Sequence, residues 1–328
     1  MNPIPDLAAR GIRSSLRKLI QSAALIGAML ATTGIQACPV PVYQYSLEHW
    51  ETDPYPVVIH GGENLSEEQL AAVAFLESAA RGDEVPANLE VRREDGDGAT
   101  GAETTPRIEL LYPKTTGIRK PVWSGELSLE NARAIVDSPV REVVGKSLAG
   151  RVSAVWVLLE SGDRGADNEA ENTLRRELDL AAKTAAVPET AEWGGETIEI
   201  NHKVAFKIVR LGREDPAERV FVDMLLASEP DLKDDFDGQP MAFPIYGRGL
   251  ILYALVGRGI NGTTIRAATD FLTGPCSCQV KAGNPGTDLL LSVDWAKEVE
   301  ATTPAAVGGT TGTGGFLQGL DEADAPEN

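Results

Sequence analysis

The sequence predicts an α/β protein made of two units, each with a mixed central sheet flanked by helices. Short apolar runs of the kind found in buried strands recur along the chain, and residues 154–159 (AVWVLL) form the most continuous of them. Segments with apolar residues at helical spacing separate these runs. The length of 328 residues and the hydrophobic content of 42% allow two cores of ordinary size.

The first unit is expected at residues 57–137. Its strands are predicted at 57–60, 88–95, 107–112 and 121–123, and its helices at 66–80 and 128–137; residues 139–148 are expected to continue the chain as another helix or a bridge to the second unit. Ser66 and Gln69 have the spacing of a capping box at the start of the first helix. The polar, glycine-rich residues 96–105 predict a loop. The lead-in segment, residues 39–56, carries several aromatic side chains and is expected to pack on this unit.

The second unit is expected to follow the same plan. Its strands are predicted at 154–159, 206–211, 241–246 and 250–256, and its helices at 169–185, from about Pro216 onward, and at 264–272. Residues 162–168 predict a loop, and Gly247-Arg248-Gly249 predicts a hairpin turn. After about residue 300 the chain turns to Thr, Gly, Ala and acids, which predicts a disordered tail at 301–328.

The order β-α-β-α-β-β-α over residues 153–272 resembles the thioredoxin fold, and residues 57–137 resemble the same plan with a loop in place of the middle helix. The resemblance implies two thioredoxin-like domains, the first abbreviated, at 38–150 and 151–300. It also implies a cis-proline before or within the third strand of the second unit, at Pro240 or Pro244. Pro106 stands ahead of the third strand of the first unit.

The resemblance stops at the residues that carry the family's redox chemistry. Redox members have Cys-x-x-Cys between the first strand and the first helix, whereas this chain has HGGEN at 60–64 and ESGDR at 160–164. Thiol exchange requires a thiolate. The usual dithiol reaction is therefore excluded at both places, and a thioredoxin-like fold by itself implies no function.

The N-terminus predicts export. Residues 1–18 are polar and basic, and residues 19–35 are apolar and uncharged, as in a signal peptide. The next residues resemble a bacterial lipobox, because Ile35, Ala37 and Cys38 match it while Gln36 departs from it. The resemblance implies that 1–37 is cleaved and that Cys38 carries a lipid, anchoring the protein at the periplasmic face of the cell envelope. Ordinary cleavage with a plain Cys38 thiol, or an uncleaved anchor, are the alternatives.

The charge of the chain restricts its partners. The net charge is -19, and residues 1–37 carry +3, so the remaining chain carries -22. Such a surface repels phosphates, which argues against nucleic-acid binding and against adsorption to anionic headgroups. Contact with cations or with basic partners is compatible with it.

Cys276-Ser277-Cys278 is the most distinctive cluster of reactive side chains. We expect a static disulfide between Cys276 and Cys278 that stiffens a turn in an oxidising compartment. The alternatives are a redox pair, with Lys281 favouring the thiolate, and metal capture. Zinc usually needs about four ligands and no other Cys or His is near in sequence, so no metal site is predicted.

The other sequence patterns give weaker indications of function. Residues 257–262 match G-x-G-x-x-G, but no acid-ended strand follows, so we expect a glycine-rich corner and no nucleotide cofactor. The acidic loops 95–98 and 234–238 fail the calcium-loop pattern. His49, His60 and His202 stand singly, and no nucleophile elbow occurs. Ser161-Gly162-Asp163 is either a ligand-binding loop or a plain strand-to-helix turn.

These observations favour a non-enzymatic envelope lipoprotein that acts as a binding or assembly module for an unknown envelope protein. An oxidoreductase that uses Cys276 and Cys278 is the alternative. A low-affinity cation-binding acidic protein is a further alternative.

Overall fold

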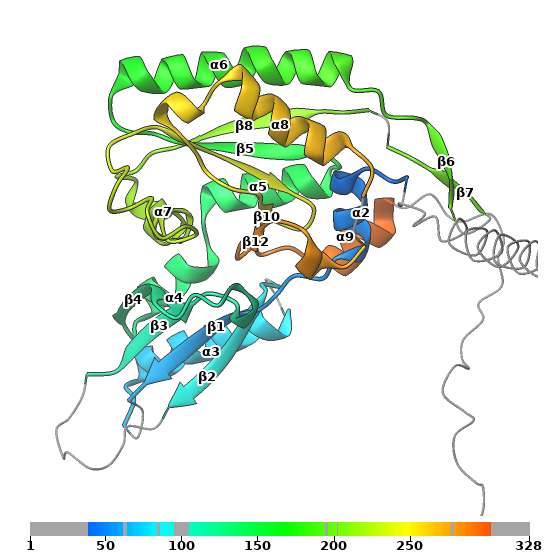
Figure 1. Cartoon of the computed structure of the whole chain (residues 1–328). Coiled ribbons are helices and arrows are strands. Elements are labelled where there is room, and N and C mark those ends of the chain that lie inside the picture. The colour runs from blue at the N-terminus through cyan, green and yellow to red at the C-terminus, as the bar shows by residue number, and fades with distance from the viewer. Residues whose placement is uncertain are drawn as a thin grey trace, which may run out of the picture.

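The computed structural model describes residues 39–61, 64–83, 86–94, 105–193, 196–201, 203–276 and 279–302. The chain forms a four-stranded and a six-stranded mixed sheet with packing helices, which confirms the predicted α/β class (Figure 1). Cys38, Cys278, His202, the acidic loop 95–98 and the tail from residue 303 lie outside the described residues.

The four-stranded sheet has the order β2-β1-β3-β4. Its strands are β1 (Tyr55–His60), β2 (Leu89–Glu94), β3 (Arg107–Leu111) and β4 (Pro121–Glu126). β1 pairs with β2 in parallel and with β3 antiparallel, and β4 adds antiparallel to β3. α3 (Glu67–Arg81) begins with the predicted capping box, and α4 (Leu129–Val136) and α5 (Pro139–Ala149) follow β4.

The six-stranded sheet has β5 (Ala154–Leu159) at its centre. β8 (Phe206–Leu211) pairs with β5 in parallel and β9 (Met241–Tyr246) antiparallel. β10 (Leu250–Ile251) and β11 (Leu255–Val256) both pair with β9, and β12 (Thr287–Asp288) pairs with β10. α6 (Arg164–Thr184) and α8 (Gly262–Thr273) cover one face, and α5 and α7 (Arg219–Leu226) the other (Figure 1).

Three expectations about local structure were wrong. The helix expected at 169–185 begins at Arg164, because Asp163 caps it. The strand expected at 250–256 is split into β10 and β11. All described peptide bonds are trans, so neither Pro240, directly before β9, nor Pro244, inside β9, is a cis-proline.

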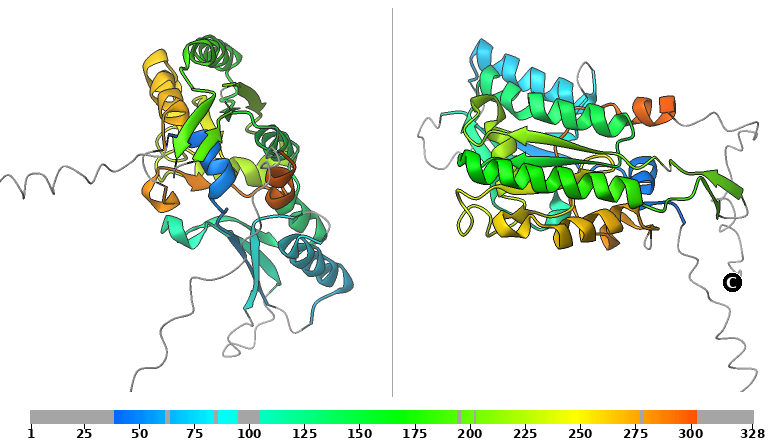
Figure 2. Two further views of the ribbon diagram at one scale, coloured as in Figure 1. Left: turned by 90° about the vertical axis from the view of Figure 1, so that its right-hand side faces the viewer. Right: turned by 90° about the horizontal axis from the view of Figure 1, so that it is seen from above.

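Several elements were not predicted. They are α2 (Val42–His49), the hairpin of β6 (Thr190–Trp193) and β7 (Glu196–Glu199), β12, and α9 (Trp295–Thr302). The hairpin projects from the body near α2 (Figures 1 and 2). Gln44 of α2 holds its base, donating from Nε2 to the carbonyl of Glu199 over 3.3 Å and accepting from the Asn201 amide over 2.8 Å.

The first part of the lead-in segment, residues 40–50, packs largely on the second unit, which corrects its expected place on the first, whereas Tyr55 at its end belongs to β1 of the first sheet. Tyr45 and Trp50 join an apolar cluster around Trp156 of β5. Arg248, in the turn after β9, donates to the carbonyl of Leu47 at 2.8 Å and so caps the end of α2. Gly247 permits this approach, because a Cβ there would lie 2.6 Å from the Ser46 hydroxyl oxygen.

One apolar core joins the two sheets. A single cluster contains Val57 and Ile108 of the first sheet together with Val157, Phe221 and Phe243 of the second unit. Buried polar contacts reinforce this core. Arg141, which is 3% exposed, donates from its guanidinium group to the carbonyls of Leu290 at 3.0 Å and Ile135 at 2.7 Å. Burial lowers the pKa of Arg141 to about 10, which leaves it charged at neutral pH.

A buried carboxylate ties β12 to the first unit. Asp288 is 4% exposed, forms an ion pair with Lys281, and accepts a 3.1 Å hydrogen bond from the Asp53 amide. The Tyr55 hydroxyl donates to the Asp288 carbonyl. Burial raises the pKa of Asp288 to about 6, and the charge of Lys281 opposes this rise without cancelling it.

We predict that Asp288 makes stability fall as pH rises. Because its pKa is higher in the folded than in the unfolded chain, the protonated carboxyl stabilises the fold fully below about pH 4. This contribution is lost as pH rises through about 6, and it amounts to about 3 kcal/mol. Urea unfolding from pH 4 to 7.5 should show wild type losing stability relative to Asp288→Asn. Glu51→Gln, which removes an exposed charge of the same sign, should follow wild type; parallel profiles for wild type and Asp288→Asn would contradict the assignment.

Candidate functional site

The loop between β5 and α6, residues 160–163, is the first strand-to-helix connection of the second unit, and it contains no cysteine. It follows the central strand, and the Glu160 amide donates to the carbonyl of Leu211 at the end of β8. Gly162 turns the chain with a φ of 93°. Asp163 then caps α6, accepting from the amides of Gly165 at 2.7 Å and Ala166 at 3.2 Å. The conformation of the loop is thus determined by Gly162 and Asp163, which both lie within it.

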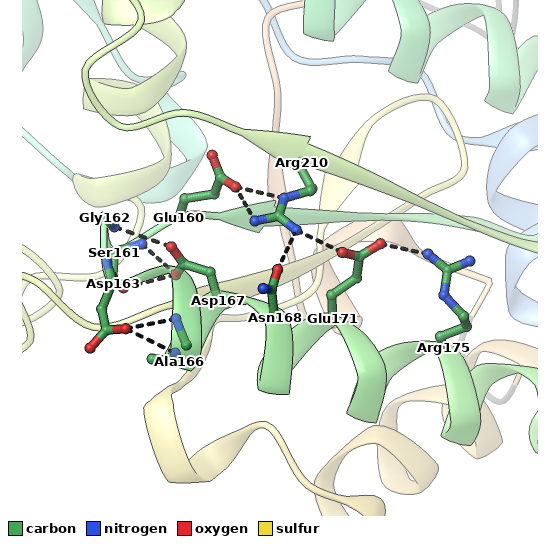
Figure 3. A network of polar contacts seen from close by, with 11 residues as sticks. Glu160, Ser161, Gly162, Asp163, Ala166, Asp167, Asn168, Glu171, Arg175 and Arg210 are labelled. Carbon is green, nitrogen blue, oxygen red and sulfur yellow. Dashed lines mark hydrogen bonds and ion pairs between the residues drawn. The ribbon is translucent and has the colours of Figure 1, made fainter.

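Asp167 locks this loop from inside the helix. Its side chain is 2% exposed and accepts from the Ser161 amide and hydroxyl, each at 2.8 Å, and from the Gly162 amide at 3.2 Å (Figure 3). A buried carboxylate needs such partners, and amides that bond a carboxylate are no longer available to an external anion. The helix start at Asp163 therefore satisfies its donors internally.

A charged surface flanks the locked loop. Arg210 of β8 binds Glu160 at the end of β5 and reaches Asn168 at 3.1 Å and Glu171 at 2.7 Å on α6 (Figure 3). Glu171 also pairs with Arg175 one turn later. The hydrogen bond from Arg210 to Glu160, reinforced by Glu171, raises the pKa of Arg210. The charges of this surface alternate in sign and are paired with one another.

Arg213 connects the same loop to the segment before β9. Its guanidinium donates to the carbonyls of Glu160 at 3.2 Å and Gln239 at 3.1 Å, and it lies 3.4 Å from the Asp237 carboxylate. The acidic loop 234–238 is thus anchored through Asp237. In the described part of the chain, no three His, Cys, Asp or Glu side chains are placed to hold a metal ion.

The corresponding place in the first unit begins at His60. Its ring lies between Glu94 of β2, 3.5 Å from Nδ1, and Glu109 of β3, 3.1 Å from Nε2. Arg107 pairs with Glu109 at 2.6 Å. Sequence reasoning treated His60 as isolated, and the strand register that brings these carboxylates beside it depends on pairing between distant segments. Gly62 and Glu63 lie outside the described residues.

Cys276 lies in the core. It is fully buried in the apolar cluster around Trp156, and its amide donates to the Val40 carbonyl at 2.9 Å. Because Cys278 lies outside the described residues, the Cys276–Cys278 disulfide stays a prediction. Lys281, which only the redox alternative places beside a thiolate, binds Asp288, the Asp53 carboxylate at 3.3 Å and the Glu51 carbonyl at 2.7 Å. A sulfur atom buried in this way is not accessible to a substrate.

The remaining motifs have local roles. Residues 257–262 form a turn after β11, and Asn261 caps α8 by accepting from the amides of Thr263 and Thr264. β11 pairs antiparallel with β9, whereas a dinucleotide loop follows a strand of a parallel βαβ unit. His49 ends α2, with its ring centroid 4.5 Å from that of Tyr45.

Comparison with known proteins identifies no relative, since no family model and no curated protein matches the chain. Among the described residues, every helix falls short of the length or the apolar character that crossing a bilayer demands.

We predict that removing Asp167 loosens the loop and lowers stability. Asp167→Ala leaves the amides of Ser161 and Gly162 without their acceptor and should cost about 2–3 kcal/mol of unfolding free energy. Hydrogen exchange should quicken at those two amides. Arg175→Ala removes an exposed ion pair of the same network and should cost at most about 0.5 kcal/mol. Equal stability of the two variants would show that the carboxylate does not hold the loop.

Proposed function

We propose that the protein is a non-enzymatic binding or assembly module of the bacterial cell envelope. A lipid on Cys38 holds it at the periplasmic face of the membrane. Its body consists of two thioredoxin-like units, the first abbreviated, and its partner is another envelope protein.

The pairing of the strands supports the thioredoxin-like assignment. In each unit the first two strands are joined through a helix and pair in parallel, as β1 with β2 and β5 with β8. In each unit the third strand then pairs antiparallel with the first, and a hairpin and a helix complete the order. This is the element order on which the resemblance rests.

The observation that carries the proposal is the state of the β5–α6 loop. Family enzymes keep an exposed nucleophile there, whereas here Asp163 and Asp167 occupy the donors of the loop and no sulfur is present. Cys276, on which the alternative oxidoreductase depends, is fully buried. What remains accessible beside the loop is the charged surface of Arg210, Glu171 and Arg175, which suits the recognition of a partner.

The membrane anchor is tested by intact mass. Protein extracted from membranes should begin at Cys38 and carry the added mass of a diacylglyceryl group and an acyl chain. Cys38→Ala should shift the protein to the soluble fraction. An unmodified chain that begins at Met1 would refute the anchor. Alkylation before and after reduction, in the same spectra, reports whether Cys276 and Cys278 are joined.

The absence of dithiol activity is tested by insulin reduction. We expect wild type and the double variant Cys276→Ser/Cys278→Ser to reduce insulin at the same background rate, because a buried thiol is not accessible to substrate. Cys278→Ser alone preserves the buried side chain and controls for loss of folding. A wild-type rate above background, together with background rates in both the single and the double variant, would favour the oxidoreductase.

A further inference from the structure

The chain becomes part of the fold almost immediately after Cys38. Val40 is 1% exposed, and its carbonyl accepts from the Cys276 amide at 2.9 Å. The Val42 amide donates to the Gly274 carbonyl at 3.0 Å, and Pro41 bridges to Pro275. The backbone is therefore fixed to the second unit from Val40 onward.

This leaves no length of chain for a flexible spacer. Cys38 precedes Val40 by two residues, and an extended chain advances about 3.5 Å per residue, so the two lie within roughly 7 Å. The headgroup layer of one leaflet is about 5–8 Å thick. A lipid on Cys38 must therefore draw the folded body against the headgroups.

Exposed apolar side chains lie beside this attachment point. Among the described residues, the large hydrophobic side chains that are exposed are those of Leu70, Val143, Leu180 and Val280. Val280 is 65% exposed and follows Cys276 closely, in a loop that Trp50 holds by donating to the Gln279 carbonyl at 3.0 Å. Leu180 is 46% exposed and lines, with Gly274 and Pro275, a groove of about 560 Å³ between α6 and α8.

We propose that this end of the second unit lies flat on the bilayer and contacts electrically neutral phospholipid headgroups. The surface, here termed the anchor-proximal surface, comprises Pro39, Gly274, Pro275, Leu180 and Val280. Figure 2 views the molecule toward the end where the chain begins and where α8 ends. The lipid is neutral because the chain after residue 37 carries -22 and is repelled by anionic headgroups. The inference rests on the proposed lipid at Cys38.

The contact is tested by quenching with brominated phosphatidylcholine. Val280→Trp and Leu70→Trp each place one added tryptophan at an exposed apolar position, beside the anchor and on α3 of the first unit. The lipidated proteins are reconstituted in vesicles of that lipid, and the quenching of each is compared with that of the parent. We expect the tryptophan at 280 to be quenched at least threefold more than the one at 70.

A second variant separates contact from mere proximity to vesicles. A flexible linker of twenty Gly and Ser residues between Cys38 and Pro39 should reduce quenching at 280 to the level at 70. Equal quenching at 280 and 70 in the lipidated protein without the linker would overturn the inference and leave the proposed anchor intact. Absence of lipid mass on Cys38 would overturn the anchor, and the inference with it.

Discussion

The burial of β5 on both faces is the constraint on which the structure depends. Alternate residues of this strand point to opposite sides, so Val155 and Val157 enter the core shared with the first sheet, while Trp156 and Leu158 enter the core under α6 and α8. All six residues of the strand are buried. A strand buried in this way fixes the positions of the segments on either side of it, including the loop at residues 160–163.

Buried charges in this protein act as internal ties. Asp167 holds a loop to its own helix, Asp288 holds β12 to the first unit, and Glu218 accepts from the Ser138 hydroxyl and from the Val140 amide at 2.7 Å, joining α7 to α5. Asp167 and Glu218 have hydrogen-bond donors within reach, which is the condition for burying a charge without a large penalty, whereas Asp288 keeps a raised pKa because Lys281 only partly offsets its burial. The buried carboxylates therefore connect elements of the fold, which distinguishes them from the many exposed acidic side chains.

Local signals in the sequence predicted most of the two sheets and their helices, because period and capping chemistry are properties of neighbouring residues. The capping box at Ser66 is an example. The early start of α6 had a signal too, since Asp163 is a favoured N-cap residue in front of a helical pattern. The docking of α2 and the carboxylates beside His60 depend on contacts between segments distant in sequence, so the periodicity of neighbouring residues could not predict them. The role of Asp167 is local, but it depends on the turn that places Ser161 and Gly162 over the first turn of α6. The hairpin of β6 and β7 has little apolar alternation, and Gln44, distant in sequence, secures it.

The attachment of α2 has a consequence for the order of folding. Arg248, which caps α2, is separated from Leu47 by 201 positions, and the strand-like contacts of Val40 and Val42 wait for residues 274–276. The segment that is synthesised first among the folded residues is thus among the last to form its native contacts. Contacts that close so long a loop form late and slowly. Until those contacts form, the apolar side chains of Tyr45 and Trp50 stay uncovered, and exposed apolar surface of this kind favours aggregation of the incompletely folded chain.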